Sequence, residues 1–315
     1  MPQLRRLADA KLVIGIPTVP RTPSQLGRTL ASIVDGIPPH LRAHVKVVVF
    51  NAAAPPASHG EVQALRDQYA DLLRSGWLTV LENPGGYPPC AEDDPGRRPG
   101  EELSYLQWRR KVVLDFAHVA GHCAARGDFY LHVEDDMLAT RDFLSKLIDW
   151  VDRWFAARDD WQFLTLFTTH RLADRASLPP KDFFSCCALL FRSAEAAAFA
   201  AYATRNATAN ELDFLLRDFT VETGKAIFVR SPSLFQHLGL FSSFQGQAHP
   251  LQTAHFQERF VDTVARSLRE AWHLARTEPR SLPALLRWRT AVLFPPVVPL
   301  KKWVRGLVAR RRPGG

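Results

Sequence analysis

Short apolar runs alternate with amphipathic segments along most of the chain, and this alternation predicts an α/β fold. Runs with the length and the β-branched or aromatic content of buried strands occur at 12–16, 45–50, 78–81, 129–133, 163–167, 186–191 and 226–230. Segments with helical spacing occur at 24–34, 61–74, 103–125, 142–158, 194–203, 211–219 and 253–276. Because strands and helices alternate, we expect a mostly parallel sheet with right-handed crossovers and helices on its faces.

Three consecutive acids, Glu134, Asp135 and Asp136, follow directly after the predicted strand at 129–133. They fall at the carboxyl end of that strand, where open α/β sheets bind their ligands. Clustered carboxylates repel one another, and a divalent cation such as Mn²⁺ or Mg²⁺ commonly offsets this repulsion. A cation held there can in turn hold a diphosphate, which is the chemistry of a nucleotide-sugar transferase with a DXD-type motif. The alternative is an acidic turn that only ends the strand.

Composition narrows the class of protein. A chain of 315 residues can form one large α/β domain or two small ones. We expect no secretory signal and no membrane span, because no apolar window approaches the roughly 18 residues that a span requires. The four cysteines form no CxxC pair, which argues against a zinc site and favours a reduced, cytoplasmic protein. The absence of GxGxxG and GxxxxGK[ST] motifs disfavours nicotinamide and P-loop chemistry.

The net charge of +8 comes from the carboxyl-terminal end of the chain. Residues 281–315 contain eight of the 40 basic residues and no acid, so residues 1–280 carry 32 of each sign. An apolar, proline-rich stretch at 293–300 precedes Lys301, Lys302 and Arg305. Apolar anchors beside basic residues suit an anionic membrane surface, so we expect peripheral membrane binding by this tail. Nucleic-acid binding, which we disfavour, and a disordered solubilising tail are the alternatives.

Four segments make the chain resemble glycosyltransferase family 54, the N-acetylglucosaminyltransferase IV family. They are IGIPTVPR at 14–21, QWRRK at 107–111 followed by EDDM at 134–137, ELDFLLRDF at 211–219, and SPSLFQHLGLFSS at 231–243. The resemblance implies a GT-A fold with a Rossmann-like sheet, a UDP-sugar donor, a divalent metal and an inverting mechanism. We expect a short form without the membrane anchor and lectin-like domain of the eukaryotic members. The expected parts are a GT-A catalytic domain at 1–250, a packed helix at 251–280 and a helical basic tail at 281–315.

The resemblance also implies roles for individual residues. Asp136 is expected to bind Mn²⁺ or Mg²⁺ directly, and His237 in SLFQHLG matches a histidine that many GT-A enzymes place near the metal. The expected donor-binding residues follow the first strands, precede the metal strand or belong to the acid triplet: Pro17, Thr18, Arg21, Asn51, Arg109, Lys111, Glu134 and Asp135. For the four basic or polar residues Arg21, Asn51, Arg109 and Lys111, a solvated surface position is the alternative.

An inverting transfer needs a carboxylate that takes the proton of the acceptor hydroxyl. Asp213 in ELDFLL matches the family's candidate base, and Glu211 and Asp218 are its rivals. Because Asp213 begins a predicted helix, it can equally serve as a helix cap. A long loop at 83–100 is a candidate lid, with Tyr87 and the nearby Trp108 as candidates for stacking on a sugar.

The sequence therefore predicts a metal-dependent inverting glycosyltransferase. We expect it to transfer a sugar, N-acetylglucosamine from UDP, to a hydroxyl of a glycan or glycolipid. The alternatives are another UDP-sugar donor in surface polysaccharide synthesis, or a non-catalytic protein that binds glycans or nucleotide sugars. The expected location is the cytoplasm, with peripheral attachment to the inner face of the membrane through the tail.

Overall fold

The computed structural model describes residues 6–22, 24–168, 177–238, 253 and 256, all within one compact unit of the chain. The strands are β1 (Leu12–Thr18), β2 (Val45–Asn51), β3 (Leu78–Glu82), β4 (Phe129–Val133), β5 (Met137–Ala139), β6 (Trp161–Thr165), β7 (Ser177–Leu178), β8 (Ala188–Arg192), β9 (Ala226–Val229) and β10 (Phe235–His237). The α-helices are α1 (Leu26–Asp35), α2 (Gly60–Gln68), α3 (Ala70–Arg74), α4 (Leu103–Ala124), α5 (Phe143–Trp154), α6 (Ser193–Arg205) and α7 (Leu212–Thr223). Short 3-10 helices occupy Leu7–Asp9, Pro39–His44, Pro56–Ser58 and Pro180–Asp182.

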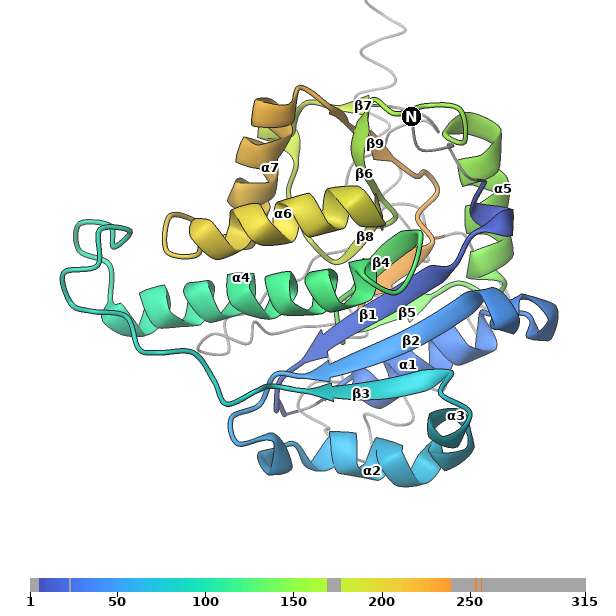
Figure 1. Ribbon diagram of the computed structural model, residues 1–315, viewed down its shortest axis with the longest axis horizontal. Coiled ribbons are helices and arrows are strands. Elements are labelled where there is room, and N and C mark those ends of the chain that lie inside the picture. The colour runs from blue at the N-terminus through green and yellow to red at the C-terminus, as the bar shows by residue number, and fades with distance from the viewer. Residues whose placement is uncertain (1–5, 23, 169–176, 239–252, 254–255, 257–315) are drawn as a thin grey trace, which may run out of the picture. The chain divides into compact units, whose positions relative to one another are not determined.

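Eight strands form one mixed sheet in the order β3-β2-β1-β4-β8-β6-β9-β7 (Figure 1). The strands β3, β2, β1 and β4 are parallel, whereas β8 runs antiparallel to both β4 and β6, and the edge strand β7 runs antiparallel to β9. A separate two-stranded ribbon pairs β5 with β10 in antiparallel register. The mostly parallel sheet with helical crossovers confirms the α/β prediction.

Helices cover both faces of the sheet and give two hydrophobic cores. One core joins the sheet to apolar residues of α1, α2 and α5, and the other joins it to α4, α6 and α7. In α1 the buried residues Leu26, Leu30 and Ile33 recur at helical spacing. At Gly15 in β1, a Cβ atom would lie 2.8 Å from the Tyr130 ring and 2.9 Å from Val119. Glycine at this position therefore allows α4 to pack closely on the central strands.

The strand register brings the ends of β1, β2 and β4 to one edge of the sheet. Thr18 at the end of β1 pairs with Asn51 at the end of β2, and Gly15 pairs with His132 of β4. The chain therefore leaves β4 into the acid triplet at the same level at which it leaves β1. This edge is where ligands bind in open α/β sheets.

Several predicted elements differ from the observed ones. The helix expected at 61–74 is divided into α2 and α3 at Tyr69, where the backbone leaves the helical region without a proline or glycine to signal it. The helix expected at 142–158 ends at Trp154, because Phe155 turns inward and packs against Trp150 and Phe228.

The ribbon of β5 and β10 was not predicted, since three-residue strands are too short to show a period. The chain after β10 also departs from the prediction at one point. Phe256, expected in a helix, instead forms an isolated parallel bridge with Ser233. The rest of that predicted helix and the tail at 281–315 lie outside the described residues, so the domain divisions expected there stay predictions.

Among the described residues, no helix combines the length and the apolar character needed to cross a membrane.

Candidate active site

The acid triplet forms the turn between β4 and β5, and its backbone is fixed from three sides. The Glu134 amide donates to the Cys187 carbonyl at 2.9 Å, and the Thr29 hydroxyl of α1 donates to the Asp135 carbonyl at 2.7 Å. The Leu238 amide donates to the Asp136 carbonyl at 2.7 Å. The neighbouring strand, helix α1 and the end of β10 thus hold the three carboxyl-bearing residues in place.

Arg21 lies across the two aspartates of the turn. Its guanidinium nitrogens are 2.8 Å from Asp135 Oδ1 and 3.0 Å from Asp136 Oδ2. The hydroxyl of Thr18, at the end of β1, donates to Asp135 Oδ2 at 2.6 Å and also contacts the His59 ring at 3.0 Å. The structure thus brings together four of the predicted site residues: Thr18, Arg21, Asp135 and Asp136.

The two aspartates differ in their electrostatic surroundings. Burial raises the pKa of the Asp135 carboxyl to about 7, although Arg21 and the Thr18 hydroxyl favour its charged form. Burial also disfavours the charge on Asp136, but His237 and Arg21 outweigh it and lower the pKa of that carboxyl. Asp136 is therefore the better anionic ligand of the pair.

His237 reaches the same turn from β10. Its Nε2 lies 3.4 Å from Asp136 Oδ2, and the side chain is 8% exposed. Within the described part of the chain, Nδ1 of His237 and Oδ1 of Asp136 are buried without a hydrogen-bond partner. A buried polar atom without a partner requires an explanation, and a bound cation supplies one here, because carboxylate oxygen with imidazole nitrogen suits Mn²⁺. The residues present therefore fit the expected divalent cation.

Asn51 and Lys111, two other predicted donor-binding residues, are engaged in local structure. Asn51 is fully buried, and its amide donates to the Pro56 carbonyl at 2.9 Å and to Glu82 at 2.7 Å. Lys111 forms an ion pair with Asp115, one turn along α4. The Asn51 contacts order the loop after β2. Pro17 is half-buried within β1, directly before Thr18.

Arg109 is fully buried and holds the loop between β3 and α4. It forms an ion pair with Glu101, with Nε to Oε1 at 2.8 Å, and donates to the carbonyls of Thr208 at 2.7 Å and Gly96 at 2.6 Å. A Cβ atom at Gly96 would lie 2.1 Å from the Thr208 carbonyl oxygen, so only glycine allows this close approach. The proposed donor site does not include Arg109, because these contacts use the guanidinium to anchor the loop.

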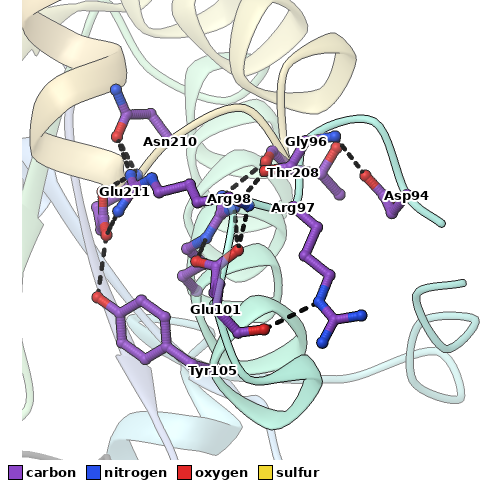
Figure 2. Close-up of polar contacts among 10 residues, drawn as sticks. Asp94, Gly96, Arg97, Arg98, Glu101, Tyr105, Thr208, Asn210 and Glu211 are labelled. Atoms are coloured by element: carbon purple, nitrogen blue, oxygen red, sulfur yellow. Dashed lines mark hydrogen bonds and ion pairs between the residues drawn. The ribbon is translucent and has the colours of Figure 1, made fainter. Parts of the chain in front are cut away.

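Figure 2 shows that the same loop also reaches the start of α7. Arg98 forms an ion pair with Glu211, with nitrogen–oxygen distances of 2.9 and 2.5 Å, and donates to the Asn210 side chain at 2.5 Å. The Tyr105 hydroxyl donates to Glu211 at 2.9 Å. Near its other end, the loop is tied to α4 by a hydrogen bond of 3.0 Å from the Tyr87 hydroxyl to Asp115. The candidate lid is thus anchored near both of its ends.

Asp213 stands in the first turn of α7, two residues after Glu211. Burial raises the pKa of its carboxyl, which is half-buried and accepts a hydrogen bond of 3.0 Å from the Phe214 amide. The N-cap position belongs to Glu211, so Asp213 does not cap the helix. Burial raises the pKa of the Cys186 thiol, and the carboxylates of Asp213 and Glu134 raise it further. Asp213 and Glu134 therefore both lie within electrostatic range of the Cys186 thiol.

The two rivals of Asp213 differ from it. The Glu211 carboxylate is already bound by Arg98 and Tyr105, which together with its amide lower its pKa although burial opposes them. Asp218 is exposed on α7. Of the three carboxylates, Asp213 alone combines partial burial with a raised pKa.

Sequence reasoning missed Thr29, His59 and Cys187. Thr29 contacts Asp135 and His59 contacts Thr18, and Cys187, directly before β8, lies opposite Glu134. None of them has a local sequence signal, because each reaches the site through a tertiary contact. A correct pairing of β4 with β8 from the sequence would have indicated Cys187.

Comparison with known proteins decides the family. The profile of the "MGAT4 conserved region" matches residues 5–168, which include β1, the loop between β3 and α4, α4 itself and the acid triplet. The chain belongs to the MGAT4 family. This confirms the resemblance stated from the sequence.

The curated relatives of this MGAT4-family chain are named as N-acetylglucosaminyltransferases. An alpha-1,6-mannosyl-glycoprotein 4-beta-N-acetylglucosaminyltransferase of Gallus gallus is 26% identical over 80% of this chain and 51% of its own length. An alpha-1,3-mannosyl-glycoprotein 4-beta-N-acetylglucosaminyltransferase A of Xenopus tropicalis is 26% identical over 49% of this chain and 28% of its own length. The aligned region thus spans about half or less of these relatives.

The fold has a counterpart among solved structures. GalNAc-T7 with UDP, GalNAc and Mn²⁺ superposes with a TM-score of 0.51 and 11% identity, over 90% of this chain and 55% of that one. The mostly parallel sheet flanked by helices is the GT-A fold. The fold prediction is therefore confirmed, and the prediction of a glycosyltransferase agrees with the names of the relatives.

Proposed function

We propose that this protein is a metal-dependent, inverting glycosyltransferase that transfers N-acetylglucosamine from UDP to a hydroxyl of a glycan or glycolipid. The observation that carries the proposal is the meeting of Asp136 with His237 at the carboxyl end of β4. Both side chains are buried and each has an unpartnered polar atom among the described residues. This donor set suits Mn²⁺ or Mg²⁺, and a bound cation would neutralise the negative charge that develops on the UDP diphosphate.

Other residues of the same site would position the cation and contact the diphosphate. Asp136 and His237 would hold the cation, and Thr18 fixes the Asp135 carboxylate beside them. Arg21 offsets the charge of the two aspartates and stands at the end of β1, where it can contact a phosphate. These residues lie on the edge of the sheet at which nucleotides bind in α/β folds.

Asp213 would act as the general base. As the acceptor oxygen attacks the anomeric carbon, its proton passes to an Asp213 carboxylate oxygen and the bond to the UDP oxygen breaks. Partial burial and the raised pKa suit this role, because a base is most effective when its pKa lies closer to the working pH. UDP-sugar donors of this kind are α-linked, so the β-linkage in the relatives' names requires inversion.

The donor sugar rests on the names of the sequence relatives. Another UDP-sugar in the same site is the first alternative, and a non-catalytic protein that binds nucleotide sugars or glycans is the second. The described contacts favour a catalyst over a non-catalytic binding protein. Glu211 is bound by Arg98, whereas the Asp213 carboxylate forms no ion pair among the described residues and can accept a proton.

The substitution Asp213→Asn tests the proposal. We expect turnover of UDP-N-acetylglucosamine with a glycan acceptor to fall by about 10²–10⁴, the usual contribution of a general base. Affinity for UDP with Mn²⁺ should be unchanged, because Asp213 belongs to α7 and not to the acid-triplet turn. The matched control is Asp218→Asn, an exposed carboxyl on the same helix, which should keep full turnover. Unchanged turnover in Asp213→Asn would contradict the assignment of the base.

A further inference from the structure

A cysteine, a histidine and a glutamate meet beside the site proposed for the hard cation. Ligand atoms of Glu134, Cys187 and His237 all lie within 4.8 Å of one another. They come from three segments: the turn after β4, the residue directly before β8 and the ribbon strand β10. The backbone hydrogen bond from Glu134 to Cys187, 2.9 Å long, fixes two of the three relative to each other.

The side chains of Cys187 and His237 are buried, and their polar contacts in the described part of the chain involve Glu134, Ser185 and Asp136. Cys187 is 2% exposed, and its thiol is hydrogen-bonded to the Glu134 carboxylate and accepts from the Ser185 hydroxyl at 2.9 Å. His237 is 8% exposed, and its Nδ1 has no partner among the described residues. This unpartnered buried imidazole nitrogen, already noted beside Asp136, indicates a ligand at this point.

Thiolate, imidazole and carboxylate together form the donor set of a borderline-soft cation. Zn²⁺ binds sulfur, nitrogen and oxygen ligands at about 2.0–2.3 Å, and three protein ligands leave its fourth position open. Mn²⁺ and Mg²⁺ prefer oxygen and gain little from a thiol. The absence of a CxxC pair does not argue against this site, because its ligands are brought together by strand pairing.

We propose that Glu134, Cys187 and His237 form a Zn²⁺ site that shares His237 with the site of the hard cation. On binding, the Cys187 thiol loses its proton to the buffer and its sulfur bonds to Zn²⁺, while the Glu134 carboxylate exchanges its contact with the thiol for the cation. Zn²⁺ at this position withdraws His237 from Asp136 and excludes Mn²⁺. Zn²⁺ is therefore an inhibitor that competes with Mn²⁺, a consequence that rests on the proposed function.

Calorimetric titration of Zn²⁺ into the full-length protein without nucleotide tests the site directly. We expect one Zn²⁺ to bind the wild type at least tenfold more tightly than Cys187→Ser. The matched control is Cys186→Ser, which removes the neighbouring buried thiol. Cys186 packs into the core on the other face of the sheet, so this variant should bind Zn²⁺ like the wild type. Equal Zn²⁺ affinity in the wild type and Cys187→Ser would overturn the proposal.

Co²⁺ absorption of the wild type gives a second readout that needs no variant to fold. A thiolate-to-Co²⁺ charge-transfer band is expected, and its absence would also overturn the site. UDP binding with Mn²⁺, measured on the same three proteins, separates this proposal from the proposed function. If the wild type does not bind UDP with Mn²⁺, only the proposed function is contradicted. If it binds UDP and also shows the thiolate band, both the proposed function and the Zn²⁺ site are supported.

Discussion

At the scale of single residues, Arg21 determines the charge balance of the candidate site. It is 23% exposed and forms ion pairs with the buried side chains of Asp135 and Asp136. Without this guanidinium, two buried carboxylates would lie side by side, and His237 and the Thr18 hydroxyl are the described side chains that would still offset their charge. From the sequence a divalent cation was expected to offset this repulsion, and in the structure the Arg21 guanidinium also offsets it.

The substitution Arg21→Ala should lower the free energy of unfolding by roughly 2–4 kcal/mol, because it leaves buried carboxylates unpaired. Added Mn²⁺ should recover part of this loss, since the cation supplies the missing positive charge and stabilises only the folded protein. Chemical denaturation with and without Mn²⁺ measures both effects. Arg153→Ala, which removes an exposed ion pair on α5, is the control and should unfold like the wild type both with and without Mn²⁺. Equal Mn²⁺ stabilisation of both variants would contradict this account of Arg21.

The raised pKa of Asp213 predicts the pH dependence of turnover. The base is active when deprotonated, so kcat should be full above its pKa and fall as the pH drops through it. Because burial raises this pKa, the acidic limb should lie above the ordinary Asp value of about 3.9. A pH profile of kcat at saturating donor and acceptor measures it, with UDP–Mn²⁺ affinity followed over the same range as the control. An acidic limb at or below the ordinary value would contradict a half-buried base.

At residue scale, the sequence identified the acid triplet, Thr18, Arg21 and His237, which the structure brings together. It could do so because the acids follow an apolar run and the other residues lie in motifs that resemble a known family. For Arg109, the same kind of sequence argument predicts a role that the structure does not support. A basic residue in a motif near a metal strand suggests a phosphate contact, yet burial and three protein acceptors assign Arg109 to the loop.

At the scale of elements, the loop between β3 and α4 is fixed to two helices and to the segment between α6 and α7. The Arg109–Glu101 pair and the close approach of Gly96 to Thr208 hold it on one side, and Arg98 binds the N-cap residue of α7 on the other. Since Asp213 lies two residues after Glu211, the loop also fixes the turn that carries the candidate base. The loop thus connects helix α4 with the start of helix α7.

The substitution Arg109→Met should destabilise the fold by roughly 3–5 kcal/mol, because it leaves a buried carboxylate and two carbonyls without their donor while keeping the side-chain volume. Chemical denaturation measures the loss. The control Arg74→Met removes an exposed ion pair and should change stability by at most about 0.5 kcal/mol. Amide hydrogen exchange should rise in both the loop and the first turn of α7. A loss no larger than the control's would show that the loop does not depend on Arg109.

Element types were largely predictable, and some boundaries and short strands were not. The β4 strand was predicted to the residue, because an apolar run ends abruptly in three acids. Helix α5 ended four residues early, since Phe155 gains more by burial against Trp150 and Phe228 than by continuing the helix. The β10 strand, which carries His237, exists only through its pairing with β5. No local pattern predicts such a contact.

At the scale of the whole molecule, the predicted GT-A architecture is confirmed and its carboxyl-terminal part is not tested. The basic excess of the chain lies in residues 281–315, outside the described residues, so membrane attachment by this tail stays a prediction from the sequence. The described part already contains every residue of the proposed metal site and the proposed base. Donor and metal binding can therefore be tested without knowledge of the acceptor.

UDP binding with and without Mn²⁺, measured by calorimetry on the wild type and on Asp136→Ala, tests the central claim most directly. The account predicts that Mn²⁺ strengthens UDP binding to the wild type at least tenfold and that Asp136→Ala loses this gain. Thermal unfolding of the variant, measured alongside, confirms that it is folded. UDP binding that ignores Mn²⁺, or a gain that survives in Asp136→Ala, would contradict the proposed metal site at the end of β4.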